Sequence, residues 1–534
     1  MKIHNKILAG AVAMAAASMS MNVYADTTED LINALVTKGV LTEDEGALLS
    51  RSHGKKMANT PTIKNSGGKF TLQSADGKNA IAITGRMHFD TRASSLDSDD
   101  VSNADALDAE SDRDFKSINA AGEHEMRRAR LGIKGKLDSV WKYNVVLNAA
   151  GKGKKGMDTA ELTFAPSKAF NIKMGQFKQA FNLEGLTSSN DIDTMERSFV
   201  NQISPHKKLG IGLTGLYGNK KAGSWMVTKY QEAFKDTDID ANANYSARLT
   251  YDFAKANKMK NNIFHVGVSG FTEDYGMTPK TSSNSSINGT THARIIKFKS
   301  AGRGYSPLFG LDVQGASATG VKFSKQNVQV ESEFGGLEAI IASGPFKLQS
   351  EYTSGEFEAE NYVSGGTNTT ASADVKAWYL TAGYILTPGV KYSKSYKGGK
   401  MKGLKVPNPF DFKTGKGMGT WELIARIEGY QVDDIKINNG AASGSESRIR
   451  GTASGGDCAS TADTYKVSSG TVSGCKSQAN TYTLGINWLA NKNVKFRAAY
   501  AQTNFDADVL APDNTDAKAF DDEGLFSMRM QYMF

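Results

Sequence analysis

The chain has 534 residues, a formal net charge of +8, 54 glycines, only 10 prolines and 2 cysteines. Its basic residues are spread along the chain, which excludes a polybasic tail, and nucleic acid is not an expected partner. After the first residues no stretch of 18 apolar residues occurs, which excludes a transmembrane helix. The mean hydropathy of −0.41 fits a soluble protein or a barrel, because half of each barrel strand faces water.

Residues 1–25 have the pattern of a secretory signal peptide. Lys2 and Lys6 form a positive start, residues 7–17 form an apolar core, and Val-Tyr-Ala at 23–25 is a small-x-small cleavage site. We expect export of the chain and a mature protein that begins near Asp26. Removal of the two lysines lowers the formal net charge from +8 to +6.

Residues 26–69 are expected to form a short N-terminal helical segment followed by a linker. Two leucine-containing stretches within residues 27–50 meet at Gly39, and Thr42 with Glu45 forms a capping box. Two short helices fit this pattern, but their apolar stripes are too short to fold alone. They would either associate between copies or dock on the main domain, and residues 51–69 are expected to be a polar linker.

Residues 70–534 show mainly a period of two, the repeat of an extended strand. In ITGRMHFDTR, Met87 and Phe89 lie on one face while Arg86, His88 and Asp90 lie on the other. Polar insertions at 97–117, 278–304, 357–374 and 438–480 separate such stretches. Short strands with unequal connections are typical of an antiparallel outer-membrane β-barrel, although a soluble all-β sandwich predicts the same alternation.

The chain ends on GLFSMRMQYMF, which alternates apolar and polar up to the carboxylate. Phe526, Met528, Met530, Tyr532 and Phe534 fall on one face. In a soluble sheet this strand would be an exposed, adhesive edge. We therefore interpret Tyr532 and Phe534 as the terminal signal of a closed barrel whose apolar face contacts outer-membrane lipid.

The two cysteines, Cys458 and Cys475, lie in a segment rich in Gly, Ser and Thr. In an exported chain a disulfide that staples a loop is the favoured interpretation. Free thiols, or a metal pair without further ligands, are the alternatives.

Basic residues predominate on the polar face of the predicted strands. Roughly ten cations there face four acids, Asp90, Asp252, Glu351 and Glu428. If the polar face lines a lumen, this excess favours anions, because a low-dielectric wall focuses the field. Ordinary solvated strand residues are the plainer explanation. The predicted basic pore lining comprises Arg86, Arg128, Arg130, Lys134, Lys136, Arg248, Arg426, Lys495, Arg497 and Arg529.

Other motifs do not predict chemistry. GIGLTG has the spacing of a dinucleotide fingerprint, but it follows a basic segment and precedes LYGNK, without the required strand and helix. The histidines lack the spacing of metal ligands, and no phosphate-binding loop or nucleophile elbow occurs. No cofactor and no metal are expected.

The segments MRRARLGIKGKLDSVWKYNVVLNAA, GQFKQAFNLEGLTSSNDIDTMERSFVNQ, GTWELIARI and the terminal SMRMQYMF resemble the phosphate-selective porin O/P family. The resemblance spans nearly the whole mature chain. It implies an all-β transmembrane barrel of about 16 strands, a homotrimer, and a loop folded into the pore, here near residues 179–204.

The resemblance also implies roles for particular residues. Lys178 of GQFK and Arg197 of MERS become candidates for the pore's narrowest part, with Arg86 opposite, and Arg128 and Arg130 would belong to a basic ladder leading to it. The sequence LTPG at residues 386–389 replaces the LTGE that is common in relatives.

Together these observations predict a passive, anion-selective channel in the Gram-negative outer membrane, for phosphate or related oxyanions. A nonspecific porin is the first alternative. An outer-membrane barrel enzyme would need a Ser or Asp paired with a His, for which no convincing arrangement is visible. A secreted β-rich adhesin is the third class considered.

Overall fold

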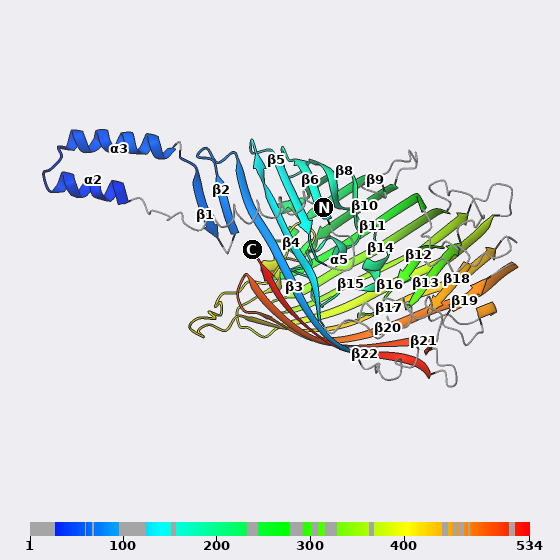
Figure 1. The fold of residues 1–534 in the computed structure, drawn as a ribbon. Helices are drawn as coiled ribbons and strands as arrows, with labels where there is room; N and C mark the ends of the chain where they lie inside the picture. The colour runs from blue at the N-terminus through cyan, green and yellow to red at the C-terminus, as the bar shows by residue number, and fades with distance from the viewer. Residues whose placement is uncertain are drawn as a thin grey trace, which may run out of the picture. The chain divides into compact units, whose positions relative to one another are not determined.

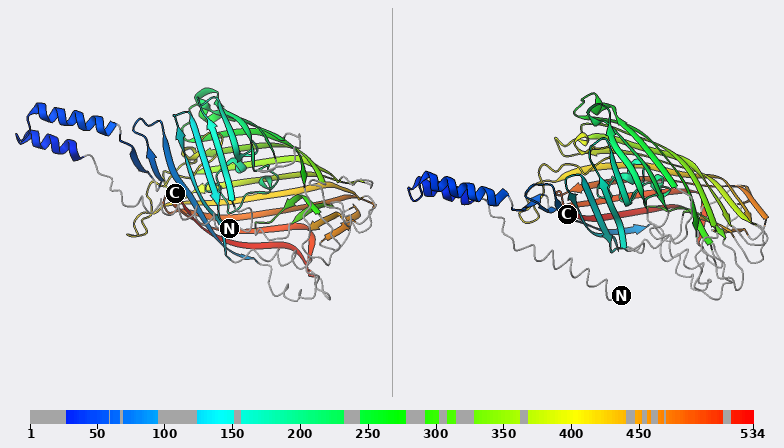
Figure 2. Two further views of the ribbon diagram at one scale, coloured as in Figure 1. Left: turned by 45° about the horizontal axis from the view of Figure 1, so that its top comes forward. Right: turned by 90° about the horizontal axis from the view of Figure 1, so that it is seen from above.

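A computed structural model of the chain shows one large barrel and a smaller N-terminal unit (Figures 1 and 2). The signal peptide expected at residues 1–25 lies outside the described residues. Among the residues that are described, no helix is both long and apolar enough to cross a membrane. The structure describes residues 27–58, 60–66, 69–94, 124–150, 156–231, 244–277, 292–301, 308–314, 328–361, 368–439, 447–451, 456–458, 464–467, 470–511 and 518–534.

The N-terminal unit contains two helices and a strand hairpin. Helix α2 (Thr27–Thr37) and helix α3 (Glu43–Ala58) contact each other, and β1 (Thr62–Ser66) pairs with β2 (Lys69–Gln73). The capping box is formed, since the Thr42 N–H donates to the Glu45 carboxylate at 2.9 Å and lowers the pKa of that carboxyl. The expectation of a linker at residues 51–69 is wrong for the described residues, because residues 51–58 continue α3 and residues 62–66 form β1.

The barrel wall is a closed antiparallel sheet. The 18-stranded sheet consists of β1, β2 and the wall strands, and the last strand pairs with the first wall strand, Met528 opposite Thr91. The wall strands are β3 (Ala80–Ser94), β4 (His124–Leu137), β5 (Trp141–Asn148), β6 (Gly156–Phe164), β7 (Asn171–Lys178), β8 (Lys207–Tyr217), β9 (Gly223–Gln231), β10 (Asn244–Asp252), β11 (Asn262–Met277), β14 (Val328–Ser343), β15 (Phe346–Asn361), β16 (Thr369–Ile385), β17 (Thr420–Asn439), β20 (Gly470–Leu489), β21 (Val494–Ala511) and β22 (Lys518–Met533).

The final strand has the orientation predicted from its alternation. In β22 the side chains of Phe526, Met528 and Met530 are 46 to 50% exposed, while Arg529 and Gln531 are buried. Exposed apolar residues on neighbouring strands continue this outward band, including Leu484 at 68% and Tyr500 at 49%. A broad apolar outer face matches a surface solvated by lipid.

The pairing of β22 with β3 closes the barrel and continues to Phe534. Phe534 exchanges two backbone hydrogen bonds with Gly85 of β3, at 3.0 and 3.1 Å, so pairing extends to the end of the chain. A Cβ at Gly85 would lie 2.2 Å from the Phe534 ring, so glycine is required for this contact.

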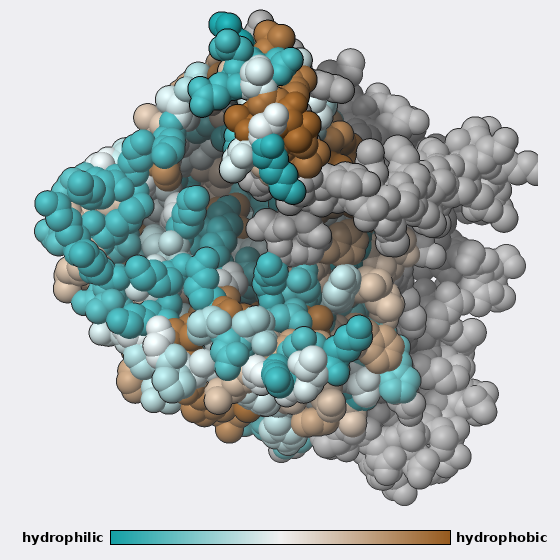
Figure 3. All heavy atoms as spheres, turned by 90° about the vertical axis from the view of Figure 1, so that its left-hand side faces the viewer, coloured by the Kyte–Doolittle hydropathy of each residue, from teal (hydrophilic) through white to brown (hydrophobic). Residues whose placement is uncertain are grey.

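Short connections lie at one end of the barrel, together with a belt of aromatic rings. Contacting pairs occur at successive turns and at the chain end, namely Trp141–Phe164, Phe170–Trp225, Tyr251–Phe253, Phe346–Tyr384, Trp421–Trp488 and Tyr532–Phe534. Figure 3 views the molecule from this end, where hydrophilic residues surround smaller hydrophobic patches. Aromatic girdles and short turns are typical of the periplasmic end of outer-membrane barrels.

One connection at this end is long. Residues 386–419, which begin with the unusual LTPG, join β16 to β17. Tyr392 and Met401 pack inside the barrel with Leu183 and Ile340, and the Tyr392 hydroxyl donates to Glu422 at 2.8 Å. This connection therefore enters the lumen.

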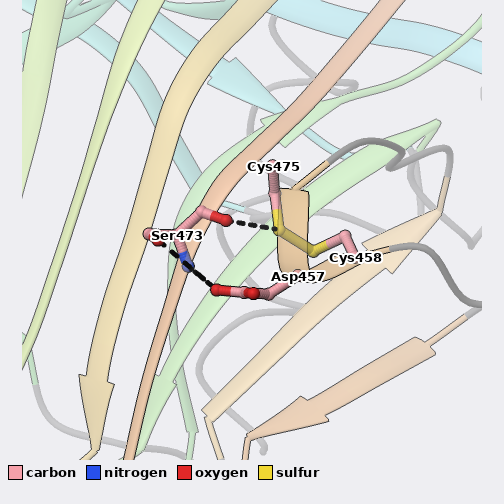
Figure 4. Close-up of a disulfide and its surroundings, with 4 residues drawn as sticks. All are labelled: Asp457, Cys458, Ser473 and Cys475. Carbon is pink, nitrogen blue, oxygen red and sulfur yellow. Dashed lines mark hydrogen bonds between the residues drawn. A yellow bond between two sulfur atoms is a disulfide. The ribbon is translucent and has the colours of Figure 1, made fainter.

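At the opposite end two insertions form a second sheet. The loop expected at 278–304 contains β12 (His292–Phe298), and the loop expected at 438–480 contains β18 (Ser447–Gly451) and β19 (Thr464–Val467). Together with β13 (Phe309–Gln314), which follows the first of these ranges, they pair in the order β12, β13, β18, β19. Strand β13 contacts β15 and β16. Cys458 and Cys475 form a disulfide between this region and β20, beside the Asp457–Ser473 hydrogen bond (Figure 4).

The inner wall beneath this second sheet is apolar, contrary to the expectation of a polar lumen face throughout. In β14, Val330 and Phe334 are buried while Glu331 and Glu333 are exposed, whereas further along the strand Glu338 is buried. The side chains keep alternating between the two faces along the strand. The inward residues change from apolar to polar, and the outward residues change from polar to apolar. The second sheet covers this surface and forms one hydrophobic core with it.

Candidate functional site

A loop between β7 and β8 crosses the lumen and is anchored to the opposite wall. It contains helical turns α5 (Leu183–Leu186) and α6 (Phe199–Gln202). Glu351 of β15 accepts the backbone N–H groups of Leu183 at 2.8 Å and Glu184 at 2.7 Å. Glu428 of β17 accepts the N–H of Phe199 at 3.0 Å. Two acids predicted to line the pore therefore hold the first residues of both helical turns.

Two predicted pore arginines fix the other side of this loop. Arg497 of β21 donates to the carbonyl oxygens of Ile192 at 2.7 Å and Thr194 at 2.5 Å. Arg529 of β22 donates to the Met195 carbonyl at 2.6 Å and makes two bonds to Asp90. The loop is thus held by wall side chains on both sides.

The three candidates for the constriction all bind residues 184–189 of the loop. Lys178 donates to the carbonyl oxygens of Gly185 and Thr187, at 2.5 and 2.7 Å. Arg197 donates to the same Thr187 oxygen at 2.8 Å and to the Glu184 carbonyl at 3.0 Å. The structure thereby brings Lys178 and Arg197 together around one carbonyl oxygen.

Arg86, the third candidate, donates to the hydroxyls of Ser188 and Ser189, at 3.4 and 2.9 Å. These hydroxyls follow Thr187 directly in the chain. The acceptors that bind all three cations are uncharged, so the hydrogen bonds position the positive charges without cancelling them.

The predicted ladder residues lie beside this cluster. Arg128 contacts His88, with 3.3 Å between Nη1 and Nδ1, and Arg130 forms an ion pair with Asp158 at 2.8 Å. Lys207, which the sequence analysis missed, also pairs with Asp158. The Asp158 carboxylate therefore forms ion pairs with two cations.

Other predicted pore cations are paired with carboxylates. Arg248 makes two hydrogen bonds to Glu338, at 2.8 and 2.5 Å, and Arg426 pairs with Glu184 of the loop at 2.7 Å. Their role in the structure is to connect elements. The count of four acids was wrong, because it omitted acids of the loop and strand acids such as Asp158 and Glu338.

The remaining predicted residues are more scattered. Lys495 is buried on the inner face of β21, in the same phase as Arg497. Lys134 is exposed, and Lys136 belongs to the segment 135–139 that is part of the N-terminal unit. The structure does not place Lys134 or Lys136 at the loop.

A cavity of about 390 Å³ lies beside the loop. Arg127, which the sequence analysis missed, lines it and makes two bonds to Glu196, at 2.9 and 3.0 Å. Arg92 is also part of its wall, and this residue continues the phase of Arg86 and Asp90. The cations that line the cavity are Arg92, Arg127, Arg128, Arg197, Lys297 and Lys299, and the acids are Glu196 and Glu428.

A closed barrel with a loop across its lumen and a basic cluster on that loop has the architecture of a porin. The sequence profile described as phosphate-selective porin O and P matches residues 100–534. The chain belongs to this family. A similar protein is Porin O of Pseudomonas aeruginosa, 25% identical over 429 residues that cover 78% of this chain and 84% of that protein.

Solved structures with similar folds include OmpT of Vibrio cholerae in its trimer form, with a TM-score of 0.43, 10% identity, and coverage of 85% of this chain and 99% of that one. An anion-selective porin from Comamonas acidovorans has a TM-score of 0.40, 9% identity, and coverage of 85% and 100%. Family membership and the barrel make this chain an outer-membrane porin channel of a Gram-negative bacterium.

Proposed function

We propose that this porin is a passive channel selective for small anions, with phosphate or a related oxyanion as its permeant ion. The observation that carries the proposal is the group formed by Arg86, Lys178 and Arg197, whose bound oxygens are all uncharged. Arginine suits this task because its planar fork of donors matches phosphate oxygens and its charge persists at any working pH.

The proposed mechanism needs only diffusion and electrostatics. An anion enters the basic cavity, where a low-dielectric wall strengthens its attraction to Arg128 and Arg197. At residues 184–189 it exchanges part of its hydration shell for Lys and Arg hydrogen bonds. Binding must remain weak enough for release, so the concentration gradient alone drives transport.

A nonspecific porin is the second candidate function. Arg248, Arg426 and Arg529 are compensated by Glu338, Glu184 and Asp90, so the field in the lumen is weaker than a count of cations indicates. The two candidates differ in what phosphate does to a chloride current. A specific site predicts block, because phosphate occupies the constriction, whereas a general pore predicts none.

Planar-bilayer recording across a KCl gradient, repeated with added phosphate, tests both statements. We expect a reversal potential that favours chloride and a chloride conductance that falls as phosphate is added. A reversal potential that favours potassium would overturn the anion proposal. Chloride preference without phosphate block would leave the nonspecific porin.

We propose further that the porin assembles as a homotrimer. The OmpT structure from Vibrio cholerae is described as a trimer, and the apolar outer face of this barrel offers area for contacts between copies. The mass of the unheated complex in mild detergent is expected to be three times that of the heated chain. A single-chain mass before and after heating would contradict this.

A further inference from the structure

The connection between β16 and β17 has a second half that lies on the outside of the barrel. Phe410 and Phe412 pack on Trp488, with ring centroids 5.3 and 6.3 Å away, and Phe412 also contacts Phe496 at 6.4 Å. Trp488 and Phe496 share the outward phase of the exposed Leu484 and Tyr500. Residues 408–419, here called the outer loop, therefore rest on the lipid-facing wall.

The outer loop is held in a defined conformation. The indole N–H groups of Trp421 and Trp488 both donate to the Met418 carbonyl, at 3.2 and 3.0 Å. The Phe410 N–H donates to the Ala490 carbonyl at 2.6 Å, and the Gly419 N–H donates to the Asn408 carbonyl at 2.8 Å. The first three bonds attach the loop to β17, to β20 and to the β20–β21 turn, and the fourth connects the two ends of the loop.

The outer loop exposes two apolar side chains and two lysines together. Phe412 is 54% exposed and Met418 is 56% exposed, although both lie on the aromatic belt. Lys413 and Lys416 are exposed between them. Aromatic residues at this level occupy the interface of a membrane, where lysine ammonium groups reach lipid phosphates.

Asp411 offsets only part of this positive charge. Its carboxylate turns back into the loop and accepts the N–H groups of Lys413 at 2.7 Å and Thr414 at 3.3 Å. These bonds lower the pKa of Asp411, so its charge is fixed within the turn. Within residues 408–419 Lys413 and Lys416 exceed this one acid, so the outer loop has a formal net charge of +1.

We propose that the outer loop is a binding site for the headgroup of an anionic phospholipid in the periplasmic leaflet. Phe412 and Met418 insert at the level of the upper acyl chains, and Lys413 and Lys416 bind the lipid phosphate. The periplasmic leaflet follows from the position of the loop at the end with short turns and the C-terminal residue. The site is separate from the ion passage and does not depend on its selectivity.

Retention of lipid by the purified full-length porin tests this proposal. Native mass spectrometry would count phosphatidylglycerol and phosphatidylcholine of equal chain length on the wild type and on Lys413→Gln with Lys416→Gln. We expect the double variant to lose about 10- to 30-fold in apparent affinity for phosphatidylglycerol, because each lysine contributes a similar attraction to the anionic headgroup. Its affinity for phosphatidylcholine should change little.

A matched control is Lys220→Gln with Lys221→Gln, two exposed lysines at the β8–β9 turn of the same end. The control should keep its phosphatidylglycerol affinity. Phe412→Ser should lower retention of both lipids, since it removes the apolar anchor.

Two results would overturn the proposal. One is equal phosphatidylglycerol affinity in the wild type and the Lys413/Lys416 double variant. The other is release of subunits from the complex with unchanged lipid per subunit, which would show that the outer loop contacts a second copy of the chain. Bilayer conductance of the same samples confirms that the barrels are folded.

Discussion

The charge that an ion meets depends on what each cation binds. Arg248 and Arg197 are both arginines near the lumen, yet the first is bound by a carboxylate and the second by carbonyl oxygens. A carboxylate cancels most of the field of its partner at a distance, whereas a carbonyl does not. We therefore expect the ion selectivity of the passage to depend on a few cations with neutral partners.

Charge reversal at such a cation should change ion selectivity. Lys178→Glu or Arg197→Glu is expected to shift the permeability ratio toward cations by at least about tenfold. The reason is that unit charges about 8 Å apart interact by about 2 kcal/mol at an effective dielectric constant of 20. Reversal potentials in a KCl gradient measure the shift.

Lys436→Glu is the control for this prediction, because Lys436 is exposed on a long strand and paired with Asp434. It should leave the reversal potential unchanged. If both Lys178→Glu and Arg197→Glu keep the preference of the wild type, the constriction lies elsewhere.

Sequence periodicity could predict which arginines point inward, but not what they bind. Arg529 and Gln531 are buried as the alternation of β22 requires. The partner of Arg529, Asp90, lies on the first wall strand, and such a long-range pair follows only from barrel closure. The alternation did not identify Arg127 as an inward residue, because Arg127 lies out of phase with Arg128. Its side chain nevertheless reaches Glu196 of the loop.

At the scale of elements, the loop across the lumen depends on wall carboxylates. Glu351→Gln should loosen it, because an amide offers one acceptor oxygen where the carboxylate binds the N–H groups of Leu183 and Glu184 and the Tyr379 hydroxyl. Hydrogen bonds to charged groups contribute about 1.5–3 kcal/mol each. We expect stronger open-channel noise in single-channel recordings.

The control for this substitution is Glu356→Gln, on the exposed outer face of the same strand. It should give recordings like those of the wild type. Equal noise in the two variants would mean that Glu351 does not hold the loop.

The second sheet should depend on its disulfide more than the barrel does. The double change Cys458→Ser with Cys475→Ser removes a cross-link over 17 residues, which typically stabilises by about 3 kcal/mol. We expect faster proteolysis within residues 440–480. The difference in gel mobility between the heated and the unheated barrel should stay unchanged. Unchanged proteolysis would show that packing alone holds the second sheet.

The alternation predicted the inward and outward sides of strands where one face contacts lipid, but it did not predict exact strand boundaries. The chemistry of β14 reverses between Glu333 and Leu337 because a second sheet replaces water on its inner side. Three of its four described strands lie in insertions that resemble ordinary polar loops in the sequence. The residues that cover an inner wall cannot be identified from the wall itself.

At the scale of the whole molecule, the outward and inward faces can be tested chemically. The two native cysteines form the disulfide, so a single added cysteine supplies a unique thiol. In membranes, Met528→Cys should react with a lipid-soluble maleimide and not with a charged, water-soluble one. The reason is that Met528 is 50% exposed on the apolar outer face.

The neighbouring change Ser527→Cys provides the comparison, because Ser527 lies on the inner face and lines the basic cavity. It should react with the charged reagent. The opposite pattern at both positions would place lipid inside and water outside, and the channel interpretation would fail.

The pairing of β22 with β3 has a consequence for biogenesis. These strands are the last and the first of the wall, so the hydrogen bonds that join them form only after the strands between them have been made. Closure is therefore a late step of folding. Until it occurs, the N–H and C=O groups of both strands lack their partners, which water tolerates and hydrocarbon does not.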